Sequence, residues 1–309
     1  MTDMILGSWR DSTKMQYNTY LKQWDVFCKL GQQRSTDAGI AVALDFLYEL
    51  HSKGLGYSAL NTARSAISSI MTVGKNKIDF GAHKLVCQFM KGVFNSRPSL
   101  PRYAAIWDPD IVLQYLRKLR PCRRLPLKLL TMKVVVLLAL LTVQRVQTLH
   151  LIRLENISIT ADRVQIVIDD KVKTSRPTWH LKPIVFTKYT INKSLCIVRY
   201  LKAYIDRTES LRGSESQLFI SFQKPHRKVT KCTISRWIKL VLRRSGVDVS
   251  MYKAHSTRAA SASKASEHVS IDKILKAGGW SSSSSYMKHY NLAPLCAENS
   301  VQEALVKDA

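Results

Sequence analysis

The chain has few cysteines, and none of them forms a pair with the spacing of a zinc or redox site. Its 309 residues contain six cysteines and no Cys-x-x-Cys motif. The sequence therefore excludes a zinc ribbon and a redox dithiol, and we expect reduced, structural thiols in an intracellular protein. The cysteines are Cys28, Cys87, Cys122, Cys196, Cys232 and Cys296.

Long apolar runs are also missing. The run Val134–Val143 falls short of the roughly 20 residues that cross a bilayer, so it predicts a buried helix. No secretory signal opens the sequence, and no internal repeat is evident. We therefore expect no membrane partner. Because hydrophobic residues still make up 46% of the chain, the sequence predicts folded cores rather than wholesale disorder.

Acidic residues are scarce. Asp and Glu number 22 against 48 Lys and Arg, which gives a formal net charge of +26. This excess favours a polyanionic partner, of which nucleic acid is the commonest. No acidic cluster suits a magnesium ion, so we expect neither a metal nor another cofactor. The densest basic run, Arg117–Lys128, is compatible with a DNA contact, a nuclear-import patch or a solvated linker.

The charge and the residue pattern both divide the chain. Residues 1–107 hold 13 basic and 7 acidic residues, so most of the excess lies further on. Residues 1–96 predict a bundle of four short amphipathic helices without a strand. We place their starts at Ser12, Thr36-Asp37, Ser58 and His83. Two prolines, Pro98 and Pro101, mark a linker, which we place at residues 97–107.

Residues 108–309 predict a second, larger domain that is mainly α-helical with a small antiparallel sheet. Asp108 and Pro109 form a helix start, and a buried helix follows near 126–143. Alternating apolar residues predict strands at 164–168 and 181–185, joined by a polar hairpin. Further helices are expected near 192–206, 231–244, 256–266, 270–277 and 283–290.

Two arginines in this second domain are suited to binding a phosphate. Arg145 follows the buried helix, and Arg258 stands three residues after His255, which places the latter pair on one helical face. Guanidinium groups bind phosphate oxygens through paired N–H donors at any cellular pH, and histidine can exchange a proton with a reacting group. Each residue taken alone is equally compatible with a solvated surface cation.

Tyr290 is the candidate nucleophile, and Tyr286, four residues earlier on the same face, is the rival. Trp280 follows two glycines, so its indole N–H can approach a phosphate, although a tryptophan there also suits a core. A lysine in the polar hairpin can protonate a leaving oxygen. Lys173 is our choice, and Lys171 stays open. Ordinary packing or solvation is the alternative for each of these residues.

Taken in chain order, these residues resemble the catalytic set of the tyrosine recombinase (phage integrase) family: Arg, Lys, His-x-x-Arg, His or Trp, and Tyr. The stretch from Gly279-Trp280 through five serines to Tyr290 resembles the end of the family's second motif, which is our reason for preferring Tyr290 to Tyr286. The resemblance covers nearly the whole chain. Its hairpin and Trp280 are most similar to the DIRS and Crypton recombinases of eukaryotic mobile elements. The full set is Arg145, Lys173, His255, Arg258, Trp280 and Tyr290.

The resemblance implies an enzyme that cleaves and rejoins double-stranded DNA through a 3′-phosphotyrosyl link, without metal or ATP. It also implies a C-shaped clamp of a core-binding domain and a catalytic domain, and a homotetramer on two DNA sites. The expected location is the nucleus, or the cytoplasm in a prokaryotic host. The tail from Leu292 to Ala309 is expected to pack either on a neighbouring copy or on its own domain.

The sequence departs from the family pattern at two places. Many members carry an acidic residue three positions after the first arginine, where this chain has Thr148, and the approach Leu141-Thr-Val-Gln lacks the glycine often found there. An inactive DNA-binding protein derived from a mobile element therefore remains an alternative. A type IB topoisomerase, which uses similar chemistry, is the alternative enzyme.

Overall fold

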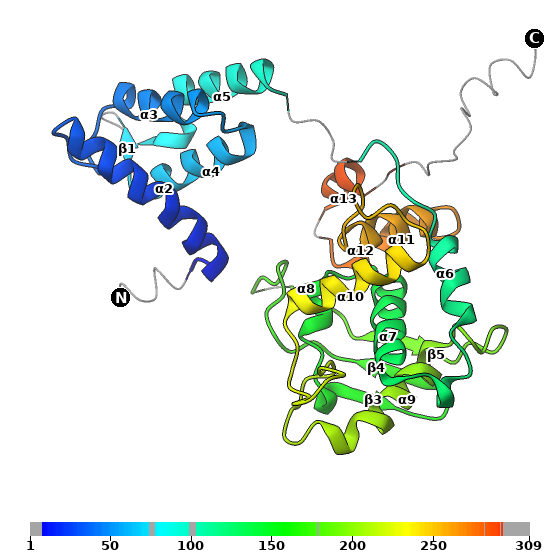
Figure 1. Ribbon diagram of the computed structural model, residues 1–309. Coiled ribbons are helices and arrows are strands. Elements are labelled where there is room, and N and C mark those ends of the chain that lie inside the picture. Colours follow the sequence, from blue (N-terminus) through cyan, green and yellow to red (C-terminus); the bar gives the residue numbers. More distant parts are fainter. Residues whose placement is uncertain are drawn as a thin grey trace, which may run out of the picture. The chain divides into compact units, whose positions relative to one another are not determined.

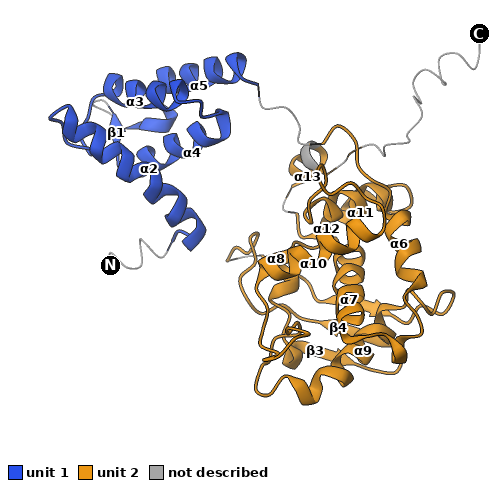
Figure 2. Cartoon of the chain, viewed as in Figure 1, with its two compact units in different colours: residues 1–101 blue, residues 102–309 orange. Residues whose placement is uncertain are grey.

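The structure, a computed structural model, describes residues 8–73, 78–98, 103–177, 179–280, 282–290 and 292. The chain divides into two compact units, residues 1–101 and 102–309 (Figure 2). The elements are mostly helices with short antiparallel strands, which confirms the predicted class of secondary structure. Within the described residues, no helix combines the length and apolar character needed to cross a membrane.

The described part of unit 1 contains four α-helices and one short pair of strands. The helices are α2 (Asp11–Leu30), α3 (Ile40–Ser52), α4 (Tyr57–Ser68) and α5 (Lys84–Ser96). Strand β1 (Thr72–Val73) pairs with β2 (Ile78–Asp79), and η1 (Phe80–Ala82) follows β2. Our expectation of no strand in residues 1–96 is therefore wrong. The two-residue strands are too short to show the alternation by which a sequence indicates a strand.

The helix starts in unit 1 also differ from those expected. The residues that flank α3 and α4 at their N-termini are Gly39 and Gly56, both with extended backbones, and not the Thr36-Asp37 pair or Ser58. Glycine is accepted at this position because it satisfies the backbone geometry without a side chain. The fourth helix begins where predicted, with the His83 side chain accepting from the backbone N–H of Leu85.

The core of unit 1 is aromatic at its centre. Trp24 is fully buried, and its ring centroid lies 5.3 Å from that of Phe46. The Trp24 indole Nε1 donates a hydrogen bond of 2.9 Å to the carbonyl of Ser35. Such a partner is what a buried indole N–H requires, so Trp24 is a structural residue of this unit.

Unit 2 is built around the long apolar helix α7 (Leu127–Thr142). It packs on α9 (Ile197–Thr208), α10 (Lys231–Arg244) and α11 (Ser256–Ser266). Its Lys133 also donates a hydrogen bond to the Leu116 carbonyl of α6 (Pro109–Lys118). Helix α7 is buried over most of its length because it is apolar on every face. The predicted start of α6 is confirmed: the Asp108 carboxylate accepts from the N–H of Asp110, and Pro109 opens the helix.

The sheet of unit 2 has three antiparallel strands in the order β3-β4-β5. They are β3 (Ile157–Ile159), β4 (Arg163–Ile166) and β5 (Ile184–Thr187). The two predicted strands are confirmed with shifted ends, and β3 was not expected. The short helices η2 (Cys122–Arg124), η3 (Leu154–Asn156) and η4 (Glu209–Leu211) connect the larger elements.

The last three helices gather at one end of unit 2, away from the sheet (Figure 1). They are α11, α12 (Ile271–Gly278) and α13 (Ser283–His289). Helix α11 packs on α7 and α12, and α12 packs on α13. The chain passes from α7 into α8 (Val146–His150), whose start at Arg145 was predicted. The fold therefore groups all the elements that carry candidate residues except the hairpin of Lys173.

Candidate active site

The turn between α7 and α8 carries Arg145 and holds a strained valine. Val143 ends α7 with φ +54°, in the left-handed region that a β-branched residue rarely adopts. Its carbonyl accepts a 2.6 Å hydrogen bond from Nη1 of Arg258. Such strain persists only where surrounding contacts enforce it, and it is concentrated at functional sites. The turn therefore places Arg145 in extended backbone directly beside a contact of the second arginine.

Arg258 is buried yet incompletely hydrogen-bonded. Only 1% of the residue is exposed, and the guanidinium carbon lies 3.5 Å from the centre of the Trp280 ring system. Burial lowers the pKa of Arg258 to about 9, Arg145 lowers it as well, and Tyr290 raises it. The group thus keeps its charge at neutral pH. Its Nε and Nη2 meet no hydrogen-bond acceptor within the described residues.

No carboxylate of the described part of the chain lies within 4.0 Å of Arg145 or Arg258. Arg145 nevertheless lies close enough to Arg258 to lower the pKa of the Arg258 guanidinium. A buried cation with unused donors is costly, and an anion that accepts from those donors offsets the cost. The pair is suited chemically to a phosphate.

Two glycines allow Trp280 to stack on Arg258. A Cβ added at Gly278 would lie 1.9 Å from Cζ3 of Trp280, so the indole covers this glycine directly. Gly279 ends α12 with φ +67°, and its added Cβ would lie 3.2 Å from Cδ1 of Leu181. The sequence indicated the turn, but not that Gly278 gives room to the ring. Trp280 is 7% exposed, and its buried Nε1 has no partner within the described residues.

Tyr290 reaches this cluster from its own chain. Its Oη lies 3.0 Å from Nε2 of His255, and its ring centroid lies 4.9 Å from that of Trp280. The guanidinium carbon of Arg258 lies 5.2 Å from the same ring. The backbone is fixed as well, because Ser263 Oγ on α11 donates a 2.8 Å hydrogen bond to the Tyr290 carbonyl. The phenol and the imidazole are close enough to exchange a proton.

Tyr286 occupies a different environment. It is fully buried, its ring lies 5.4 Å from Trp280, and its Oη is 3.5 Å from the carbonyl of Ala262. A phosphodiester has no access to a hydroxyl that the core covers. This placement favours Tyr290 over Tyr286 as the nucleophile.

The lysine candidates lie on a separate turn. Lys171 and Lys173 are both exposed, and a hydrogen bond of 2.9 Å from the N–H of Ser175 to the carbonyl of Val172 closes the turn. Neither lysine makes a hydrogen bond or an ion pair with the described residues. The hairpin nevertheless approaches the cluster, since side-chain atoms of Thr174 and Leu181 lie near Gly279. The structure thus leaves the choice between the two lysines open.

Sequence reasoning missed the residues that hold the site together. Gln144 is 4% exposed, and its Nε2 donates a 2.5 Å hydrogen bond to the carbonyl of Ala277. Its Oε1 accepts from Thr148 Oγ1 at 3.2 Å. Thr148 stands where many family members have an acid, and here it orients Gln144. The pair links the α7–α8 turn to the end of α12, which leads into Trp280.

Across the residues that the structure describes, no three His, Cys, Asp or Glu side chains gather in a way that could hold a metal ion.

Comparison with known proteins identifies the family. Residues 115–294, more than half of the chain, match the phage integrase family. The chain therefore belongs to the phage integrase family. A comparison with curated protein sequences found no match.

Solved structures show the same fold. The Tn1549 transposon integrase in complex with transposon right end DNA has a TM-score of 0.63 at 12% identity, covering 98% of this chain and 95% of that one. A lambda integrase dimer bound to a COC′ core site has a TM-score of 0.60 at 14% identity, covering 96% and 95%. The XerH recombinase in a post-cleavage complex has a TM-score of 0.58 at 14% identity, covering 88% and 73%. At such identities the likeness concerns the fold.

Proposed function

We propose that this protein is a site-specific DNA recombinase or integrase that cleaves and rejoins DNA through a 3′-phosphotyrosyl link. One observation carries the proposal. The Tyr290 hydroxyl lies 3.0 Å from His255 Nε2, beside the unpartnered donors of Arg258 and Trp280. A nucleophile, a proton acceptor and anion-binding groups thus converge on one point, which is the arrangement that phosphoryl transfer to a side chain requires.

In the proposed reaction, the Tyr290 oxygen bonds to the phosphorus while the bond from phosphorus to the 5′ oxygen breaks. The phenolic proton passes to His255 Nε2, and Lys173 supplies a proton to the leaving 5′ oxygen. Arg145 and Arg258 hold the non-bridging oxygens, and the Trp280 N–H donates to one of them. A 5′ hydroxyl of a second strand then reverses the step. The proposed reaction uses neither ATP nor a metal ion.

The partners follow from the proposed reaction and from related proteins. Lambda integrase has been solved as a tetramer bound to a Holliday junction, and the Tn1549 integrase with transposon DNA. We propose likewise that four copies of this chain assemble on two duplex sites, each closing around DNA as a C-shaped clamp. The tail beyond Leu292, which lies outside the described residues, is proposed to pack on a neighbouring copy or on its own unit.

The origin and location are also proposals. The hairpin from Lys173 to His180 and the tryptophan at position 280 favour a recombinase of a eukaryotic mobile element, of the DIRS or Crypton type. We propose the nucleus as its location, with the cytoplasm as the counterpart in a prokaryotic host.

Covalent trapping tests the function. The wild-type chain is incubated with a pool of duplexes that carry a randomised core and a nick, so that cleavage releases a short strand and cannot reverse. Protein-linked DNA that survives denaturation is then recovered and sequenced. The proposal predicts linked DNA with a common sequence, its loss in Tyr290→Phe, and its persistence in the matched variant Tyr286→Phe, provided that this variant folds.

The alternatives predict other outcomes. Retained specific binding with no linked DNA in any pool identifies an inactive DNA-binding protein. Linked DNA combined with supercoil relaxation by a monomer, and no joining of two duplexes, identifies a topoisomerase. Loss of the protein–DNA link in Tyr286→Phe but not in Tyr290→Phe identifies Tyr286 as the nucleophile.

A further inference from the structure

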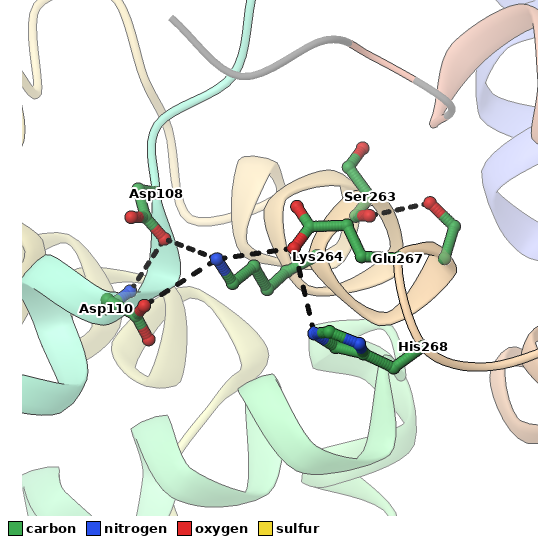
Figure 3. A network of polar contacts seen from close by, with 7 residues as sticks. Asp108, Asp110, Ser263, Lys264, Glu267 and His268 are labelled. Atoms are coloured by element: carbon green, nitrogen blue, oxygen red, sulfur yellow. Dashed lines mark hydrogen bonds and ion pairs between the residues drawn. The ribbon is translucent and has the colours of Figure 1, made fainter. Parts of the chain in front are cut away.

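Residues 103–110, which we call the strap, lead from the connection between the units into α6 and lie along α11. At the start of the strap, Tyr252 Oη donates a 3.0 Å hydrogen bond to the carbonyl of Ala105. In its middle, Trp107 Nε1 donates a 2.8 Å hydrogen bond to Ser256 Oγ. At its end, Asp108 and Asp110 face a lysine of α11 (Figure 3). The strap therefore contacts both ends of α11.

The contact at the first turn of α11 is fully enclosed. Trp107 is 2% exposed and Ser256 is 1% exposed. Ser256 lies in the chain between the two candidate residues His255 and Arg258. A buried indole has a single donor and a fixed ring plane, so its hydrogen bond fixes the rotation of the helix turn that it holds.

The contact at the far end of α11 is electrostatic. Lys264 Nζ lies 3.7 Å from Asp110 Oδ2, 4.0 Å from Asp108 Oδ1 and 3.4 Å from Glu267 Oε2. These carboxylates, Asp108 first, raise the pKa of Lys264. The neighbouring Ser263 is the residue that holds the Tyr290 carbonyl. The partly exposed ion pairs with Asp108 and Asp110 thus link the strap to α11 beside the anchor of the candidate nucleophile.

Helix α11 carries one part of the candidate site, and the α7–α8 turn carries another. Arg258 and the Ser263 anchor of Tyr290 belong to α11 and His255 directly precedes it, whereas Arg145 and the Val143 carbonyl belong to the turn. The position of α11 therefore decides how the two arginines face each other. A displacement on the order of 1 Å at a catalytic centre can cost about 100-fold in rate.

We propose that Trp107 is a positioning residue that acts through Ser256. Its buried hydrogen bond holds the first turn of α11 and thereby sets the place of Arg258 relative to Arg145. The inference rests on the function proposed for the site.

The test uses the full chain and two variants of the contact, Trp107→Phe and Ser256→Ala. Trp24→Phe is the matched control, because it removes a buried indole N–H with a 2.9 Å hydrogen bond from unit 1. Three quantities are measured for each protein: the urea midpoint, the dissociation constant for trapped DNA sites, and the rate of covalent linkage at saturating DNA. The side-chain Nε–H signal of Arg258, assigned by its loss in Arg258→Lys, is followed by NMR without DNA.

A positioning role predicts a rate about tenfold or more below wild type in Trp107→Phe and Ser256→Ala, with a dissociation constant unchanged within about twofold. The Arg258 signal shifts in both variants. The control loses stability while its rate and signal stay as in wild type. A wild-type rate at saturating DNA together with an unmoved Arg258 signal overturns the proposal.

The measurements distinguish an error in the proposed function from an error in the positioning role of Trp107. If wild-type protein links to no DNA, the function proposed for the site is wrong, and the Arg258 signal alone then decides whether the strap positions α11. If Trp107→Phe does not fold, Ser256→Ala, which keeps the ring and removes only a hydroxyl, tests the same contact by the same measurements.

Discussion

Among its described residues, unit 2 buries the basic side chains Lys133 and Arg258 against aromatic rings, and the two differ in how their hydrogen bonds are satisfied. Lys133 is fully buried, lies 3.7 Å from the centre of the Tyr200 ring, and donates 2.8 Å hydrogen bonds to the carbonyls of Leu116 and Leu119. Arg258 is 1% exposed and lies 3.5 Å from the Trp280 ring, but only Nη1 finds an acceptor among the described residues.

The comparison shows that burial of a basic side chain does not by itself mark a functional residue. Lys133 caps the C-terminal end of α6, and its amine finds hydrogen-bond acceptors within the fold, so its role is structural. Arg258 keeps donors without an acceptor near Arg145 and Tyr290, so an anion bound there would offset the cost of its burial. The two sites therefore differ in whether hydrogen-bond donors of the buried side chain are left without an acceptor.

The largest effect is expected when each of these basic side chains is replaced in turn. Arg258→Lys keeps the charge but loses the planar fork of donors, and we expect the rate of covalent linkage to fall about 10²–10³-fold. Lys133→Met removes a basic side chain of similar burial and is expected to leave the rate per folded molecule unchanged. Single-turnover assays with a nicked duplex measure both. Equal losses of rate in Arg258→Lys and Lys133→Met would contradict the distinction between a functional Arg258 and a structural Lys133.

The stacking of Trp280 on Arg258 can be disturbed without substituting either residue. Gly278→Ala places a Cβ against the Trp280 ring, which must move away from the guanidinium, and we expect a loss of roughly 10–100-fold in rate. Gly92 in α5 is the matched control, since nothing lies within 4 Å of its added Cβ. Gly92→Ala should stabilise the protein by about 0.5–1 kcal/mol and leave the rate unchanged. A fully active Gly278→Ala variant would show that the reaction does not depend on the position of the Trp280 ring.

Much of the candidate site could be predicted because its chemistry fixes residue types and their order. The arginines, His255 and Tyr290 stand at spacings that the structure brings together around one point. The buried state of Lys133 could not be predicted, since a lysine in an apolar helix gives no sign of which carbonyls will meet it. The left-handed backbone of Val143 also gave no signal, because the contacts that enforce it come from Arg258, 115 residues away.

The fold was predictable to a similar degree. The amphipathic helix α10 follows from periodicity, and the bounds of α10 and α11 match the expected ones. Strand β3 was missed because its three residues alternate too briefly, and the sheet is stabilised by pairing with β4 rather than by local preference.

The burial of Lys133 should make the stability of the protein depend on pH. Burial lowers the pKa of Lys133 to about 7, so between about pH 7 and 10.5 the unfolded chain binds one more proton than the folded one. Stability from this group is therefore fully present above 10.5 and is lost as pH falls towards 7. We expect the wild-type unfolding free energy to rise by up to about 1.4 kcal/mol per pH unit between pH 7.5 and 9 relative to Lys133→Met.

Urea unfolding of the two proteins at pH 7.5, 8.2 and 9 measures that difference. Arg258 does not contribute to it below its own pKa of about 9. Parallel stability curves for wild type and Lys133→Met would show that Lys133 stays charged in the fold.

The smallest effect concerns the strained turn. In most helices alanine is more stable than glycine by about 1 kcal/mol. At position 143 the backbone is left-handed, where alanine is strained by roughly 1–2 kcal/mol and glycine is not. We therefore expect Val143→Gly to be at least as stable as Val143→Ala in urea. The usual order of stability would mean that the turn relaxes without cost.

Mass spectrometry of the trapped protein–DNA complex tests the central claim most directly. After nuclease and protease digestion, the account predicts one modified peptide in which the phenolic oxygen of Tyr290 carries a 3′-phosphate nucleotide. A nucleotide on Tyr286 or on any other side chain, in protein that is demonstrably cleaving DNA, would contradict it.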